Sequence, residues 1–282
     1  MRYIDMHTHT TMSDGLLTPS ELIDYAVEKK LSGIAITDHD TVDGIEEAMI
    51  YSGQIDNFIV LAGIELSTEL LGEEVHILGY GIDYKDKELL KLLEEIQSHR
   101  KKRIKEIVVK LQSLGLAITH EQVIECAGPG TIGRPHLAKT LLANNYVETI
   151  EEAFNKYLAK GAPAYVPRYK LHPKEAIRLI KNVRGLSVLA HPGLIKSQKI
   201  IRKVLEMNID GIEVHHPDHT WEERCRFEDI ARENRLFITA GSDFHGPKVG
   251  AERHGDLASE KISEDYIKSL LGKCEGVVDH RG

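Results

Sequence analysis

The sequence of 282 residues has no long hydrophobic run. No segment approaches the roughly 18 consecutive apolar residues that read as a membrane-spanning helix. The first residues, MRYIDMHTH, lack the basic, apolar and small-residue regions of a secretory signal peptide. These two absences predict a globular cytoplasmic protein without a membrane partner.

The sequence also has few cysteines and fewer basic than acidic residues. Cys126, Cys225 and Cys274 are far apart and form no CxxC pair, which argues against a disulfide framework and against a cysteine zinc site. Lys and Arg number 36 against 44 Asp and Glu, and the formal net charge is −8. Because broad capture of nucleic acid depends on a basic face, no long duplex nucleic acid is expected as a partner. A cleft that holds divalent ions could still attract an anion.

Metal-competent side chains, in contrast, recur along the chain at the ends or edges of short apolar runs. One of the 15 histidines taken alone would be read as a core or surface residue. The repeated placement predicts a metal site, and imidazole and carboxylate without thiolate suit Zn, Mn or Fe. The candidate ligands are His7, His9, Asp14, His39, Glu65, His76, His191, Asp243 and His245.

Apolar runs alternate with amphipathic segments, which indicates parallel βαβ units and an α/β fold. Two helix starts are marked by a capping residue followed by proline, at Thr18-Pro19 and His172-Pro173. Ligands from nearly every strand favour a barrel over a doubly wound sheet, because closure brings all strand ends around one axis. The expected strands are Tyr3–His7, Gly33–Thr37, Phe58–Glu65, Glu74–Tyr80, Leu186–Ala190, Gly211–His215 and Leu236–Ala240.

One connection is too short for a helical crossover. Few residues separate Glu65 from His76, so the third and fourth strands should pair as an antiparallel hairpin. His76, near the start of the fourth strand, would then lie at the same end of the sheet as Glu65, near the finish of the third.

Residues 84–171 are charged and helix-periodic, and they predict a helical insertion between two barrel segments, 1–83 and 172–282. In TIGRPHLA, Gly133 and Pro135 place Arg134 at a turn before a helix, where an arginine can bind a phosphate through two hydrogen bonds. A surface arginine is the alternative, and His136 fits either a helix cap or a ligand contact. Arg168 and Lys170 are weaker anion-binding candidates.

The motifs YIDMHTHTTMSDG, ITDHDT, GIELST, VHILGY, LAHPG and GSDFHG resemble those of the PHP (polymerase and histidinol phosphatase) family along the whole chain. The resemblance implies a distorted (β/α)7 barrel with an inserted helical substrate-binding subdomain. GRPHLA and GIEVHHPDHT make the chain most similar to the small bacterial members that act on nucleoside 3′,5′-bisphosphates and on short RNA 5′ ends.

The resemblance also implies three divalent metal ions, with Mn placed ahead of Fe and Zn. His7, His9 and Asp243 would hold the first ion, and Glu65 would bridge it to a second. The second ion would also take His76 and His191, and the third would take Asp14, His39 and His245. Asp5, Asp38 and Asp40 would orient ligand histidines or cap strand ends.

The implied reaction is hydrolysis of a terminal phosphate ester by a metal-bridging hydroxide. Glu65 and Asp243 would serve it at the metals, Arg134 would bind a phosphate together with His136 and Arg168, and His216 or Asp218 would protonate or orient the leaving oxygen. The expected substrate is a small phosphorylated nucleotide or a short oligonucleotide end. A histidinol-phosphate phosphatase and a non-catalytic metal-binding PHP module are the alternatives.

Overall fold

The structure is a computed structural model of residues 1–282, and it describes all of them except 129, 168, 170, 248–254 and 272–282. The chain divides into two compact units, Met1–Leu90 with Lys170–Gly282, and Lys91–Tyr169. No helix in the described part of the chain is long and apolar enough to cross a membrane.

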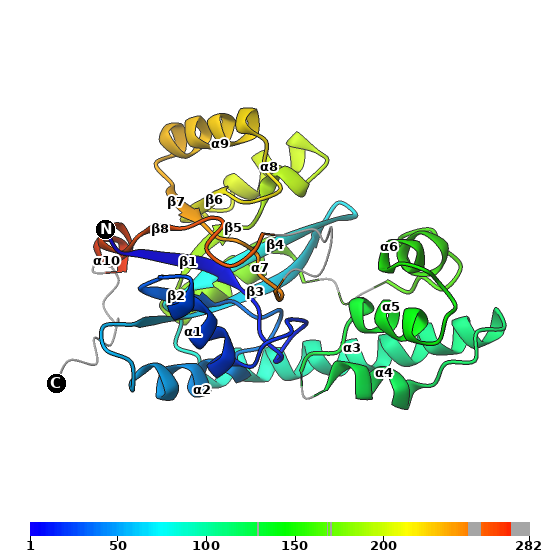
Figure 1. The fold of residues 1–282 in the computed structure, drawn as a ribbon. Helices are drawn as coiled ribbons and strands as arrows, with labels where there is room; N and C mark the ends of the chain where they lie inside the picture. The colour runs from blue at the N-terminus through cyan, green and yellow to red at the C-terminus, as the bar shows by residue number, and fades with distance from the viewer. Residues whose placement is uncertain (129, 168, 170, 248–254, 272–282) are drawn as a thin grey trace. The chain divides into compact units, whose positions relative to one another are not determined.

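The first unit is built around one sheet with the strand order β7-β6-β5-β4-β3-β2-β1-β8 (Figure 1). The seven strands predicted from the sequence are confirmed, but β3 continues to Leu70, past its predicted end at Glu65, and the short strand β8 was not foreseen. Their bounds are β1 Tyr3–Thr8, β2 Gly33–Ile36, β3 Ile59–Leu70, β4 Glu73–Tyr80, β5 Leu186–Leu189, β6 Gly211–His215, β7 Phe237–Ala240 and β8 Ile262–Ser263.

Strand directions explain how the sheet almost closes into a barrel. Strands β1, β2 and β3 run parallel, as do β5, β6 and β7, whereas β4 is antiparallel to both β3 and β5. The predicted hairpin is therefore confirmed, and it turns at Leu71 and Gly72, both with positive φ. A bridge between Thr8 and Phe244 joins the segment after β7 to β1. The α/β barrel predicted from the alternating pattern is confirmed.

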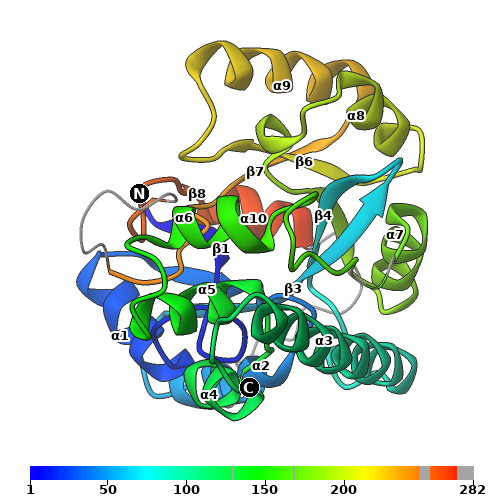
Figure 2. The same cartoon turned by 90° about the vertical axis from the view of Figure 1, so that its right-hand side faces the viewer.

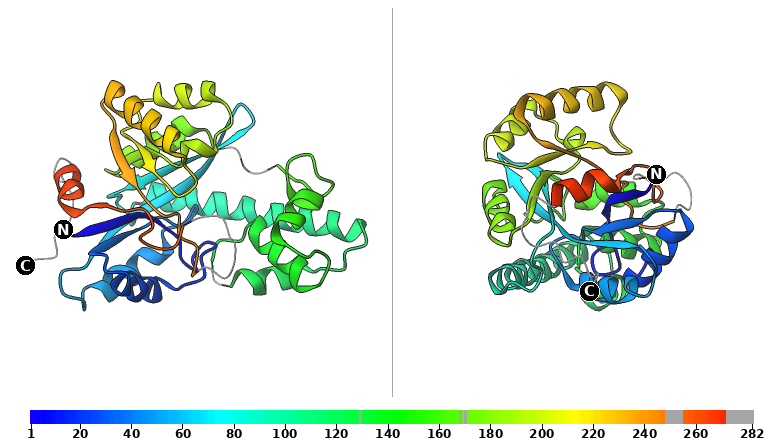
Figure 3. Two further views of the ribbon diagram at one scale, coloured as in Figure 1. Left: turned by 45° about the horizontal axis from the view of Figure 1, so that its top comes forward. Right: turned by 90° about the vertical axis from the view of Figure 1, so that its left-hand side faces the viewer.

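Helices of the first unit lie outside this sheet (Figures 1 and 3). Both predicted helix starts are confirmed: Thr18 caps α1 and His172 caps α7, each with a glutamate completing a capping box. The bounds are α1 Pro19–Glu28, α2 Asp43–Ser52, α7 Pro173–Asn182, η2 Pro192–Leu194, α8 Gln198–Leu205, α9 Trp221–Asn234 and α10 Glu264–Leu271.

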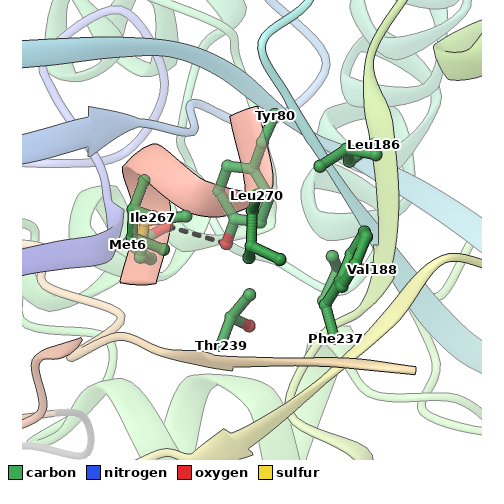
Figure 4. A pocket seen from close by; sticks show the side chains of 8 residues that line it. All are labelled: Met6, Tyr80, Leu186, Val188, Phe237, Thr239, Ile267 and Leu270. Carbon is green, nitrogen blue, oxygen red and sulfur yellow. Dashed lines mark hydrogen bonds between the residues drawn. The ribbon is translucent and has the colours of Figure 1, made fainter. Parts of the chain in front are cut away.

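A small apolar cavity lies inside the barrel and is lined by Met6, Tyr80, Leu186, Val188, Phe237, Thr239, Ile267 and Leu270 (Figure 4). Tyr80 donates a hydrogen bond of 2.8 Å to the carbonyl oxygen of Met6 across it. Its volume of about 10 Å³ has room for about one water molecule at most. This part of the interior is a packed core and not a substrate pocket.

The second unit is helical and has its own apolar core (Figure 2). Its elements are α3 Lys87–Ser113, whose first residues belong to the first unit, α4 His120–Ala127, α5 Arg134–Ala143, α6 Ile150–Ala153 and the π-helix η1 Phe154–Leu158. Ile107 and Leu111 of α3 pack in one cluster with Leu137 and Leu141 of α5. The amphipathic pattern of this segment is therefore satisfied within the unit.

Candidate metal centre

The nine predicted ligands gather at one end of the barrel, although Glu65 and His76 lie within their strands and not at strand ends. His7 is on β1, Glu65 on β3 and His76 on β4, and the others stand in the segments that follow β1, β2, β5 and β7. The antiparallel course of β4 brings His76 Nδ1 to 2.7 Å from Glu65 Oε1. The hairpin predicted from the short connection thus places both side chains at one end of the barrel.

Eight of the nine side chains form three groups in which the ligand atoms lie within 4.8 Å of one another. Glu65 belongs to two of these groups, and His191 joins no group but holds its Nε2 atom 3.0 Å from Glu65 Oε1. The groups are His7, His9, Glu65 and Asp243; His9, Asp14, His39 and His245; and His39, Glu65 and His76. His9 and His39 are each shared between two groups, whereas the family resemblance assigned each of them to one ion.

Buried polar atoms without a hydrogen bond show that the cluster fits metal ions. His7 Nε2, His9 Nε2, His39 Nδ1, Asp14 Oδ1 and Glu65 Oε2 are all shielded from solvent and make no hydrogen bond. A native protein pays a free-energy cost for such atoms unless they have a partner. Lone pairs of imidazole and carboxylate that converge in this way are the donor set of a divalent metal site. The cluster is therefore capable of binding metal ions.

The pKa shifts of Glu65 and its neighbours also indicate a metal-binding cluster. Burial alone would raise the pKa of Glu65, but the charges of His39, His76 and His7 hold it well below its usual value. Burial alone would lower the pKa of His76, but Glu65 and Glu74 raise it to about 10. The metal-free cluster therefore keeps protons on histidines, and metal ions would displace them.

In the group of His9, Asp14, His39 and His245, the pKa of His245 is also raised. Despite burial, Asp14 raises the pKa of His245 to about 9. His9 is the exception, because burial and the charge of His245 lower its pKa to about 3. A neutral His9 already has a lone pair to offer a metal ion.

Three aspartates beside the ligands accept hydrogen bonds from backbone N–H and hydroxyl groups. Asp5 accepts hydrogen bonds from the backbone N–H groups of His7, Ser242 and Ala258. Asp38 accepts from Thr10 and Ser13 in the loop that carries His9 and Asp14, and Asp40 accepts from the backbone N–H of Ser67. These contacts hold the backbone of segments that carry or adjoin ligands, and the choice between orienting histidines and capping strand ends stays a prediction.

Glu213 on β6 was missed by the sequence analysis. It is fully buried, its Oε1 lies 3.0 Å from His7 Nδ1, and its Oε2 accepts a hydrogen bond of 2.8 Å from the backbone N–H of His191. Burial would raise the pKa of Glu213, but His7 holds it below its usual value. A glutamate inside the apolar strand GIEVH was the signal that could have revealed it.

The remaining predicted residues lie in both units. His216 is fully buried in the first unit, with Nε2 3.5 Å from Asp243 Oδ2. In the second unit Arg134 begins α5, donates to the carbonyl oxygen of Leu158 and lies over the ring of Phe154. His136 Nδ1 accepts from the backbone N–H of Gly133, as the capping alternative predicted.

Arg168 and Lys170 lie outside the described residues. The roles of Arg134 and His136 in substrate binding stay predictions.

The sequence motifs and the clustered ligands agree with a known family. The family model of the PHP domain matches residues 5–166, which is more than half of the chain. The chain belongs to the PHP domain family. The resemblance inferred from the motifs is therefore confirmed, and the protein is a metal-dependent phosphoesterase and a hydrolase.

Relatives of this PHP domain act on small phosphate esters or RNA ends. The 5′-3′ exoribonuclease Rnm of Salmonella typhimurium is 35% identical over 251 residues, which cover 86% of this chain and 85% of the relative. The 3′,5′-nucleoside bisphosphate phosphatase of Chromobacterium violaceum is 32% identical over 261 residues, with 90% and 91% covered. A solved structure from Bifidobacterium adolescentis, described as a candidate metal-dependent phosphoesterase, aligns with a TM-score of 0.86 at 30% identity and covers 96% of each chain.

Proposed function

We propose that this PHP domain removes a terminal phosphate from a nucleotide. The preferred substrate is a nucleoside 3′,5′-bisphosphate, which yields the nucleoside 5′-monophosphate and phosphate, and short 5′-phosphorylated RNA is a second substrate. The observation that carries the proposal is the convergence of histidines on the buried carboxylate of Glu65, with ring nitrogens and a carboxylate oxygen that make no hydrogen bond. Two relatives with these activities, similar over most of their length, support the choice of substrate.

Three divalent ions would be held by the nine clustered side chains, with Mn first and Fe and Zn also compatible with the donor set. When bound, they would polarise the phosphate oxygens and make water nucleophilic near neutral pH. Glu65, as the member of two groups, would fix the spacing between neighbouring ions. Asp243 would join it at the group that also contains His7 and His9.

The helical part of the chain, which we assign to residues 84–171, would recognise the rest of the substrate. Arg134 supports this assignment because it stands in the first turn of α5, where backbone N–H groups are not used by the helix itself. Its guanidinium would neutralise a substrate phosphate, and His136 and Arg168 would add contacts. A cytoplasmic location is proposed together with this substrate class.

Phosphate release from adenosine 3′,5′-bisphosphate, measured with and without added Mn, tests the proposal. We expect Mn-dependent release, and parallel assays with a short 5′-phosphorylated oligonucleotide and with histidinol phosphate separate the candidate substrates. Turnover of histidinol phosphate alone would make the protein a histidinol-phosphate phosphatase. If metal-loaded protein released nothing from any of the three substrates, the proposed function would be wrong.

A further inference from the structure

Strand β6 stands between β5 and β7 yet provides no member of the three ligand groups. Its neighbours lead into segments that carry His191, Asp243 and His245. Strand β6 and the turn after it nevertheless place two buried groups, Glu213 and His216, against candidate ligands.

Glu213 uses both of its oxygens on ligand-bearing segments. Oε1 lies 3.0 Å from His7 Nδ1, while Oε2 accepts a hydrogen bond of 2.8 Å from the backbone N–H of His191. A carboxylate on Nδ1 keeps the proton of the neutral ring there, so the lone pair of His7 Nε2 points into the group that also contains Glu65 and Asp243. Glu213 therefore sets the tautomer and the direction of one ligand.

The second contact of Glu213 acts on the backbone. His191 has φ +26° and ψ +61°, a left-handed conformation that is unfavourable for a residue with a side chain. The hydrogen bond from its N–H to Glu213 helps to hold this conformation, which brings His191 Nε2 to 3.0 Å from Glu65. The same carboxylate thus positions two ligands from two different segments.

His216 lies where it can position the side chain of Asp243. Its Nδ1 accepts a hydrogen bond of 3.1 Å from the backbone N–H of Asp218, so the proton of the neutral ring is on Nε2. That Nε2 lies 3.5 Å from Asp243 Oδ2, an electrostatic contact without a hydrogen bond. A ring protonated on Nε2 has no lone pair there to offer a metal ion. Because the ring is fully buried, these contacts favour a role in holding Asp243 over proton transfer to a leaving group.

We infer that Glu213 and His216 are positioning residues of the metal centre. Strand β6 and the turn after it supply no member of the three ligand groups and instead position His7, His191 and Asp243, which come from β1, from the segment after β5 and from the segment after β7. This inference rests on the proposed metal-dependent function.

Zn(II) affinity of the full chain tests the inference without any substrate. Metal-free wild type and Glu213→Gln would be titrated with Zn(II) against a chromophoric chelator. Glutamine keeps the size of the side chain. Its amide N–H group, however, must face one of the two groups that contact the Glu213 carboxylate, which are His7 Nδ1 and the backbone N–H of His191. Replacing such an outer partner typically weakens metal binding by about 10–100-fold, and we expect a loss in that range.

The matched control is Glu228→Gln. Glu228 of α9 lies 3.9 Å from Nε2 of His215, the residue adjacent to His216, but both side chains of that pair are partly exposed and outside the ligand groups. This control should bind Zn(II) like the wild type. His216→Ala is a second test variant with the same expected direction as Glu213→Gln, and it answers the question if Glu213→Gln does not fold.

Histidine ring ¹⁵N NMR of the Zn-loaded protein supplies a readout that a merely structural role would not move. The wild type should show His7 protonated on Nδ1, and Glu213→Gln should lose that state. If folded Glu213→Gln and His216→Ala both bound Zn(II) as tightly as the wild type, the inference would be overturned. Wild type that binds Zn(II) but hydrolyses no phosphate ester would refute the proposed function and leave this inference standing.

Discussion

Replacement of Glu65 by glutamine perturbs the centre of the ligand cluster with little change in shape. In the native protein the carboxylate lies within 3.4 Å of His7 and within 2.7 Å of His76, and it belongs to two of the three ligand groups. Glutamine removes its negative charge and turns one acceptor into a donor. The variant should bind metal ions more weakly, and the pKa of His76 in the metal-free protein should be lower.

The size of the effect on metal binding follows from the position of Glu65. Outer partners of metal ligands typically account for about 10–100-fold in affinity, so a carboxylate shared by two groups should account for at least about 100-fold. That factor corresponds to about 2.8 kcal/mol of binding free energy. In the metal-free protein, Glu65 is the largest influence that raises the pKa of His76 to about 10, so this pKa should fall in the variant.

Two assays read these effects separately. Metal content after dialysis against a fixed free Mn concentration reports affinity, and an NMR titration of the histidine rings in the metal-free protein reports the pKa of His76. Asp24→Asn is a suitable control, because Asp24 is a carboxylate on α1 that accepts a hydrogen bond from the Tyr51 hydroxyl and belongs to none of the three ligand groups. Unchanged metal content together with a His76 pKa still near 10 would refute the reasoning.

Three further predictions concern other parts of the chain. Arg134→Ala should raise the KM for the bisphosphate while metal content stays near the wild-type value, and unchanged kinetics would remove Arg134 from substrate binding. Gly193→Ala should lower metal content and melting temperature, because a Cβ atom there would lie 2.5 Å from Cδ2 of His219 beside the His191 segment; a variant with wild-type values would contradict this. The pKa values of His76 and His245 are raised from 6.5 to about 10 and about 9, so their contribution to the stability of the metal-free protein is complete below pH 6.5 and is lost as the pH rises through 9 to 10. Thermal unfolding of metal-free protein at pH 7 and pH 10 should show this loss, and equal melting temperatures would argue against it.

Much of the fold was predictable because it depends on local patterns. Each of the seven main strands is a short apolar run, and the capping residues before α1 and α7 are read directly from Thr18-Pro19 and His172-Pro173. The hairpin followed from chain length alone, since few residues connect Glu65 to His76. Strand β8, in contrast, has only two residues and pairs with β1 from the far end of the sequence, so no local pattern marks it.

Part of the candidate site was predictable from local sequence, and part depends on contacts that only the folded barrel makes. The predicted ligands recur in or next to short apolar runs and therefore stand out in the sequence. The sharing of His9 and His39 between groups depends on where the loops bring their rings. The contacts of Glu213 to β1 and to the segment after β5 join residues separated by 206 and 22 positions. Pairings across a barrel depend on its closure, which no single stretch of sequence specifies.

Phosphate release from adenosine 3′,5′-bisphosphate by wild type and by Glu65→Gln, with and without Mn, tests the central claim most directly. The claim is that the buried cluster around Glu65 holds the metal ions that support hydrolysis. It predicts release by the wild type that requires Mn, and a near-complete loss in folded Glu65→Gln. Equal rates for the two proteins, or a wild-type rate that does not depend on metal, would contradict it.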